Sequence, residues 1–128
     1  MRMKRFSLIA GVVLCVPMSL GAHHSWTADY DGGKPVTVKG MVTKVEWTNP
    51  HTHFYVEAKD EKGVVTMWNF EMASTLSLER GGWTRKTLPV GAAVTVGGFG
   101  GRAVLTRAIA GSITTADGKA LFVGKPGQ

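Results

Sequence analysis

The sequence predicts a mainly β domain, a small five-stranded barrel with a short helix between the third and fourth strands. Two observations predict it. Hydrophobic and polar residues alternate along several short segments separated by turn residues, which is typical of strands. The first segment is long and contains Gly40, and a glycine within a strand often marks a bend. A long bent first strand is what a small closed barrel requires. A β-sandwich is the main alternative, and the helix favours the barrel.

Residues 1–22 have the pattern of a secretory signal peptide. Basic residues precede an apolar stretch, residues 6–16, that is too short to span a bilayer comfortably. Pro17 ends this stretch, and small residues lead up to Ala22. We therefore expect cleavage after Ala22, a periplasmic or secreted protein, and no stable membrane span after cleavage. Cys15, the single cysteine of the chain, would leave with the signal, so the fold must rest on its core.

Cleavage would leave 106 of the 128 residues, enough for one domain with a single core. It would also lower the formal charge from +6 to +3, because Arg2, Lys4 and Arg5 lie in the signal. A charge of this size on scattered side chains is not the footprint of a nucleic-acid-binding protein. We therefore expect no nucleic-acid partner.

The first elements after the signal are an N-terminal arm over residues 23–35 and the barrel domain over residues 36–124. Aromatic residues Trp26 and Tyr30 anchor the arm, and Gly32-Gly33 predicts a turn before the barrel. Residues 36–47 form the predicted first strand. Its hydrophobic positions change parity after Gly40, which places the bend there.

The second and third strands form a predicted hairpin. Asn49-Pro50 ends the first strand because proline lacks an N–H group. The next strand begins near His53, and a three-residue loop ending in Gly63 returns the chain, since glycine tolerates the left-handed conformation. This loop sets a register in which Phe54 faces Phe70, Val56 faces Trp68, Tyr55 faces Asn69 and His53 faces Glu71.

The remaining elements begin with a short helix over residues 74–80, capped by Ser74 or Thr75 and ended by Gly81 in the left-handed region. A strand over residues 93–96, a flexible glycine-rich loop over 97–101 and a strand over 102–113 follow. Asp117-Gly118 then turns into a last hairpin closed by residues 121–123. This order resembles the oligonucleotide/oligosaccharide-binding (OB) fold.

Four motifs also carry a family resemblance. They are His23-His24-Ser25-Trp26, the segment VTKVEWTNPH at residues 42–51, WNFEM at 68–72 and GWTR at 82–85. With these motifs the sequence resembles a family of small, uncharacterised bacterial secreted proteins, over nearly all of the chain that follows the signal. The resemblance implies no activity. The glycine-rich segment at residues 97–101 departs from the family's usual pattern.

All four histidines lie in two clusters, His23-His24 and His51-Thr52-His53. Cleavage after Ala22 would give His23 a free α-amine beside its imidazole, and these two nitrogens chelate a metal ion as a pair. A further imidazole would complete a nitrogen site that suits Cu(II). The candidate metal ligands are therefore His23, His24, His51, His53 and Glu71, with copper as the first metal and zinc as the runner-up. Merely exposed histidines and a structural His53–Glu71 hydrogen bond are the alternatives.

Tyr55, Asn69 and Phe99 make up a candidate ligand face. Tyr55 and Asn69 lie on the same strand face as His53, and Phe99 lies in the glycine-rich segment. The sequence has no Ser-His-Asp spacing, phosphate loop or nucleophilic cysteine. It therefore predicts a non-catalytic binding module with a histidine cluster for copper, and copper oxidation through His23 is the one enzymatic hypothesis. The alternative is a metal-independent module that docks an unknown periplasmic protein or small ligand on the barrel face.

Overall fold

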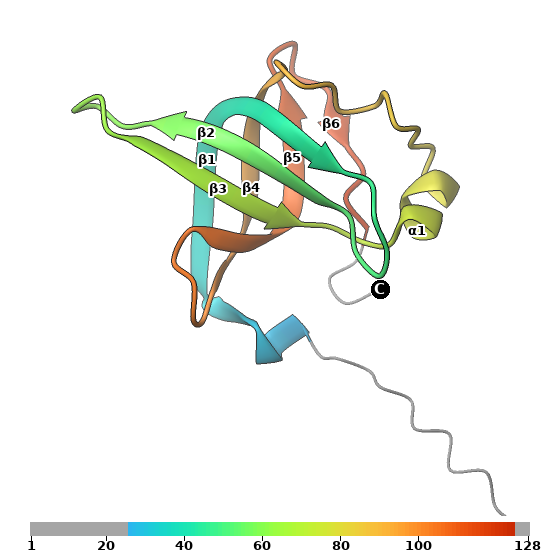
Figure 1. Ribbon diagram of the computed structural model, residues 1–128, viewed down its shortest axis with the longest axis horizontal. Coiled ribbons are helices and arrows are strands. Elements are labelled where there is room, and N and C mark those ends of the chain that lie inside the picture. The colour runs from blue at the N-terminus through green and yellow to red at the C-terminus, as the bar shows by residue number, and fades with distance from the viewer. Residues whose placement is uncertain (1–25, 125–128) are drawn as a thin grey trace, which may run out of the picture.

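The computed structural model describes residues 26–124 (Figure 1). The predicted signal peptide and the candidate ligands His23 and His24 lie outside the described residues. The elements are a 3-10 helix η1 (Trp26–Ala28), strands β1 (Tyr30–Glu46), β2 (His53–Lys59) and β3 (Val65–Glu71), helix α1 (Thr75–Arg80), and strands β4 (Ala93–Gly101), β5 (Arg107–Thr115) and β6 (Ala120–Leu121).

The strands form one six-stranded sheet in the order β3-β2-β1-β4-β5-β6. Neighbours in this order are antiparallel. A short parallel pairing between β3 and β5 brings the two ends of the five-strand series together, so that β1 to β5 form a near-ring. The predicted β-rich class and the helix between β3 and β4 are confirmed.

The β2–β3 hairpin has the predicted register. Phe54 pairs with Phe70, Tyr55 with Asn69 and His53 with Glu71. Gly63 has the predicted left-handed conformation, with φ of 82°, because the tight loop requires it. The tip of this hairpin projects away from the rest of the molecule, opposite α1 (Figure 1). Loop chemistry and alternation therefore fix which side chains of these two strands share a face.

Strand β1 begins at Tyr30, earlier than the predicted start at residue 36. Its first half pairs with β4 and its second half with β2, and Met41 has a partner in both strands. This long strand therefore pairs with two neighbours. The register shift, however, lies between Val42 and Lys44, not after Gly40. Gly40 has a different role, since a Cβ there would lie 2.2 Å from the carbonyl oxygen of Glu57.

The glycine-rich segment is not the predicted flexible loop. Residues 97–101 extend β4, where Gly98 pairs with both Val36 and Ala110. A Cβ on Gly98 would lie 2.0 Å from the carbonyl oxygen of Ile109, so the missing side chain allows the close approach of β5. The following strand consequently starts at Arg107 instead of at residue 102, and residues 102–106 form the connection.

Helix α1 begins as predicted and ends differently. The Ser74 hydroxyl accepts a hydrogen bond from the backbone N–H of Ser77, at 3.2 Å. Gly81 has φ of −81°, and the left-handed residue is Gly82, with φ of 95°. The prediction for Gly81 is therefore wrong by one position, because the Gly81-Gly82 pair offers two equivalent places for the helix to stop.

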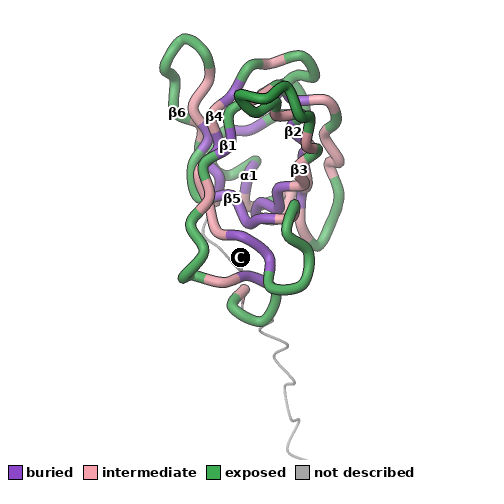
Figure 2. Tube along the Cα trace, turned by 90° about the vertical axis from the view of Figure 1, so that its left-hand side faces the viewer, coloured by how far each residue is buried: buried purple, intermediate pink, exposed green. Residues whose placement is uncertain are grey.

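The core fills the inside of the near-ring, where the buried segments lie (Figure 2). Four hairpin residues are predicted to be buried on the inward face. Phe54, Val56 and Phe70 are fully buried, whereas Trp68 is only partly buried against the core. Trp83 is also buried, and its indole N–H donates to the carbonyl oxygen of Phe122. Trp47 stacks on Trp83 with ring centroids 6.5 Å apart. Trp47 and Trp83 therefore pack as part of the hydrophobic core.

Candidate functional site

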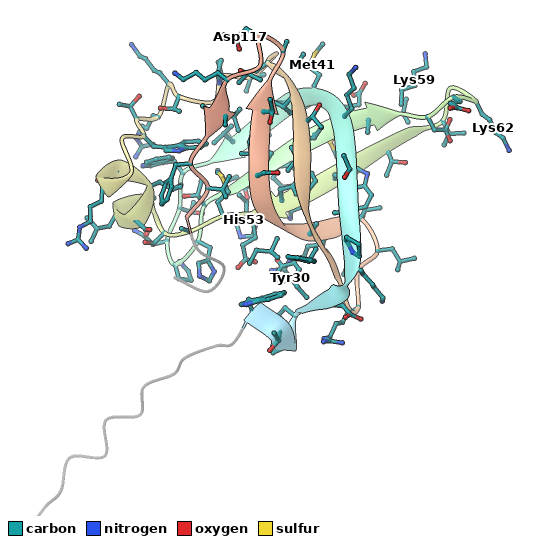
Figure 3. All side chains as sticks on the ribbon, turned by 180° about the vertical axis from the view of Figure 1, so that it is seen from behind. Tyr30, Met41, His53, Lys59, Lys62 and Asp117 are labelled. Atoms are coloured by element: carbon teal, nitrogen blue, oxygen red, sulfur yellow. The ribbon has the colours of Figure 1, made fainter. Side chains whose placement is uncertain are left out.

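An open cleft of about 390 Å³ is lined by three of the candidate metal ligands, His51, His53 and Glu71. Its lining residues come from the segment just before β1, the β1–β2 connection and the adjoining ends of β2, β3 and β5; they are Asp29, Thr48, Asn49, Pro50, His51, His53, Glu71 and Arg107. His53, at the start of β2, and Tyr30, at the start of β1, lie toward the same end of the molecule, the one nearer η1 (Figure 3). Two histidines predicted from one motif thus line one cleft.

Glu71 is the most densely bonded residue at this site. Its Oε2 accepts from the Tyr30 hydroxyl at 2.5 Å and from Arg107 Nη2 at 2.8 Å. Its Oε1 lies 2.8 Å from Nδ1 of His51. The residue is only 7% exposed, so these partners replace the water it has lost. Tyr30, His51 and Arg107, from three separate parts of the chain, therefore all bond to the same carboxylate.

The pKa values of Glu71 and Tyr30 move in opposite directions. Burial raises the pKa of the Glu71 carboxyl, but hydrogen bonds from Tyr30 and Arg107 and the nearby histidines outweigh it, and the net shift is downward. Burial, together with the hydrogen bond to Glu71 and its charge, raises the pKa of the Tyr30 hydroxyl. The folded protein therefore holds Glu71 as a carboxylate and Tyr30 as a neutral donor.

Replacing Glu71 with glutamine is expected to remove a pH-dependent part of the stability. Folding lowers the pKa of Glu71, so the ionised carboxylate contributes to the free energy of unfolding. This contribution is fully present above the pH at which an unfolded glutamate titrates, about 4.3, and it is lost as pH falls through the pKa of the folded protein. Urea unfolding at pH 7 and at pH 3–4 should show a larger loss for Glu71→Gln at pH 7. Glu57→Gln, at an exposed position of β2, controls for loss of one carboxylate. A pH-independent Glu71→Gln effect would contradict this.

His53 does not bond to Glu71, although the two residues are paired across β2 and β3. Its Nδ1 lies 3.0 Å from Oδ1 of Asn69 instead. Glu71 turns toward His51, Tyr30 and Arg107, because that side of the strand end offers it an ion pair and a hydroxyl donor. The alternative of a structural His53–Glu71 hydrogen bond is therefore wrong, while the predicted register is confirmed.

Both imidazoles of the cleft have Nδ1 engaged by the protein. Among residues 26–124, neither Nε2 has a hydrogen-bond partner. The ring of His51 is oriented by a carboxylate and the ring of His53 by an amide oxygen, which is the kind of support that orients metal-bound histidines in proteins. Nε2 of each ring is the nitrogen left for a ligand.

A complete metal site is not present in the described part of the chain. Residues 26–124 contain no group of three or more His, Cys, Asp or Glu side chains arranged to hold a metal ion. His51 and His53 supply two imidazoles, and Glu71 already bonds to three protein partners. The candidate ligands His23 and His24 lie outside the described residues.

The candidate ligand face is divided by the structure. Tyr55 and Asn69 contact each other beside His53, with Asn69 Nδ2 3.4 Å from the Tyr55 hydroxyl. Phe99 lies in β4 and stacks on Trp26 with ring centroids 5.5 Å apart. It is partly buried, and it does not line the histidine cleft. Its predicted place in an exposed loop is wrong because the loop is a strand.

Sequence reasoning did not find Tyr30, Arg107 or Asp29 as site residues. Arg107 reaches Glu71 through the parallel β3–β5 pairing, and Tyr30 is separated from Glu71 by 41 positions. No local motif links such distant residues. The one available signal in the sequence was the tyrosine at position 30 as an aromatic anchor, because the hydroxyl of a tyrosine packed against the core needs a hydrogen-bond partner.

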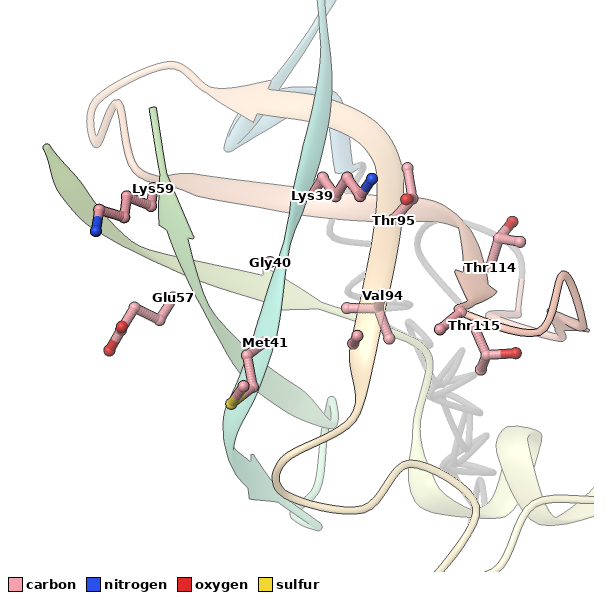
Figure 4. A pocket seen from close by; sticks show the side chains of 11 residues that line it. Lys39, Gly40, Met41, Glu57, Lys59, Val94, Thr95, Thr114 and Thr115 are labelled. Carbon is pink, nitrogen blue, oxygen red and sulfur yellow. The ribbon is translucent and has the colours of Figure 1, made fainter. Parts of the chain in front are cut away.

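A second open cleft, of about 490 Å³, lies at the other ends of β2 and β5 (Figure 4). Lys39, Met41, Glu57, Lys59 and Thr115 contribute side chains, and Gly40 lies at its centre. The cleft holds no histidine. The charged side chains that line it, Lys39, Glu57 and Lys59, are exposed.

Comparison with known proteins identifies the family. Residues 11–109 match the model of a family of unknown function (DUF6152). The chain belongs to this family. The matched range includes every candidate site residue named above, together with Arg107. No curated protein and no solved structure matches the chain.

The described residues were also searched for membrane-spanning helices. None of the helices within residues 26–124 is long and apolar enough to cross a bilayer.

Proposed function

We propose that this protein is a periplasmic or secreted, non-catalytic binding module with an OB-like barrel fold, and that its histidine cleft binds a metal ion, copper first. The observation that supports the proposal is the hydrogen bonding of the two imidazoles. His51 and His53 line one cleft, and each has Nδ1 held by a protein acceptor, which leaves Nε2 for a ligand.

The charge of the cleft supports a cationic ligand. Two carboxylates, Asp29 and Glu71, and one guanidinium, Arg107, line it, so that the carboxylates outnumber the cation. Imidazole nitrogens suit copper and zinc, and no thiolate of the described chain competes for them. Copper is favoured over zinc because an amino-terminal histidine adds an amine and an imidazole at once.

The connection to the amino terminus supports a shared site. Asp29 lines the cleft, and His23 precedes it by six residues. Residues 26–28 form η1, so at most the three residues before Trp26 can be extended, and these span about 10 Å. The proposal requires this span to bring His23 to the cleft. The proposed Cu(II) ligands are the His23 amine and imidazole, completed by His51 or His53, with His24 as a further candidate.

Calorimetric titration with Cu(II) tests this proposal. The samples are the protein beginning at His23, the same protein with one extra amino-terminal residue, and His53→Ala. We expect the extension to weaken binding by at least tenfold, because it removes the His23 amine as a ligand. We expect the same of His53→Ala if His53, and not His51, completes the site. Lys59→Ala, on the same strand but away from the cleft, is the matched control and should bind like the parent protein. Zinc is titrated in parallel.

Equal copper affinity in all samples would exclude the site formed by His23 with His51 or His53. No binding by the form that begins at His23 would overturn the metal proposal. The cleft would then belong to the metal-independent alternative, a module that docks a periplasmic protein or small ligand.

A further inference from the structure

A chain of hydrogen bonds runs from the surface to His53. Lys44 Nζ lies 2.5 Å from Glu46 Oε1, and the Tyr55 hydroxyl donates to Glu46 Oε2 at 3.3 Å. Asn69 Nδ2 donates to the Tyr55 oxygen at 3.4 Å, and Asn69 Oδ1 lies 3.0 Å from Nδ1 of His53. The residues belong to β1, β2 and β3, which are neighbours in the sheet.

The donor and the acceptor of each hydrogen bond in this series can be assigned in turn, beginning at Glu46. An ionised carboxylate only accepts hydrogen bonds, and the hydrogen bond from Lys44 lowers the pKa of Glu46. The single hydroxyl proton of Tyr55 is therefore directed at Glu46. Among the described residues, the Tyr55 oxygen then accepts from Asn69, whose amide nitrogen can donate a hydrogen bond and whose amide oxygen cannot.

The order of this chain decides the tautomer of His53. With Nδ2 of Asn69 directed at Tyr55, its Oδ1 faces the imidazole and can only accept. Nδ1 of His53 must carry the proton, and the lone pair of the neutral ring is then on Nε2. Since the hydrogen bond made by one ring nitrogen sets the state of the other, the amide controls which nitrogen is free.

We propose that Asn69, oriented by Tyr55 and Glu46, is a positioning residue that keeps neutral His53 in the Nδ1–H tautomer and so makes Nε2 its ligand-binding nitrogen. The inference rests on the proposed function only for what Nε2 binds. A purely structural amide, which merely joins β2 to β3, would stabilise the hairpin without selecting a tautomer.

The test is the tautomer itself, measured without metal. Long-range proton–nitrogen correlation NMR of the histidine-labelled protein, at a pH where the imidazoles are neutral, distinguishes Nδ1–H from Nε2–H rings. We expect His53 to be Nδ1–H in the parent protein. In Asn69→Leu it should shift toward the Nε2–H form that an unrestrained imidazole prefers, and in Asn69→Asp, which keeps an acceptor, it should remain Nδ1–H.

Two controls keep the test decisive. His51 is the internal control, because its Nδ1 faces the Glu71 carboxylate and its tautomer should not change in any Asn69 variant. Tyr55→Phe covers the case in which Asn69→Leu does not fold: it removes the acceptor that orients the amide, and we expect a mixture of His53 tautomers. An Nε2–H ring in the parent protein, or an unchanged tautomer in both Asn69→Leu and Tyr55→Phe, would overturn the inference.

Copper titration of the same variants separates the two proposals. If both hold, Asn69→Leu should bind copper about 10–100-fold more weakly, as loss of a supporting residue does at metal sites. A tautomer that responds to Asn69 in a protein that binds no copper would support the positioning role and overturn only the metal proposal.

Discussion

Truncating Phe70 to alanine is expected to lower the free energy of unfolding by about 3–5 kcal/mol, as large core truncations do. Phe70 has no exposed surface, and its ring stacks on Phe54 and Trp68 with centroids 5.2 and 5.9 Å away. The substitution removes the aromatic packing that joins β2 to β3 on the inner face. It also leaves a cavity inside the near-ring of strands.

Urea unfolding at neutral pH measures this effect. Val65→Ala is the matched control, because Val65 lies on the same strand with 52% of its surface exposed, and its loss should stay within about 0.5 kcal/mol. A Phe70→Ala midpoint close to that of the parent protein would mean that the face of β3 is assigned incorrectly.

Gly98→Ala is expected to lower the free energy of unfolding by about 1–3 kcal/mol, the range of overpacking substitutions. The added methyl group would lie 2.0 Å from the Ile109 carbonyl oxygen. That obstacle is backbone and not the end of a flexible side chain, so β4 and β5 would have to separate. The effect follows from the glycine-rich segment being a strand, and an alanine in a flexible loop would cost little.

The control for this prediction is Gly111→Ala in β5. A Cβ at Gly111 would have its nearest neighbour at 3.6 Å, an ordinary contact distance. Thermal unfolding of the two variants should therefore rank Gly98→Ala clearly below Gly111→Ala. Equal melting temperatures would contradict the close β4–β5 approach.

The hairpin and the histidine motif were determined by the sequence alone. Alternation in residues 53–58 and the Gly63 loop specify which side chains face each other, because a strand has a period of two and a loop of fixed length sets the register. These local rules are sufficient to place His53 opposite Glu71 with His51 nearby, and to place Tyr55 opposite Asn69.

Only the tertiary structure decided what the polar side chains bind. Glu71 could have bonded to His53 across the strands, but the β3–β5 pairing and the start of β1 bring Arg107 and Tyr30 to it, and His51 takes its second oxygen. The same is true of residues 97–101, whose glycines predict a loop locally and form a strand between β1 and β5. Local patterns encode period and turns, whereas a contact between residues far apart in the chain depends on how the strands close around the core.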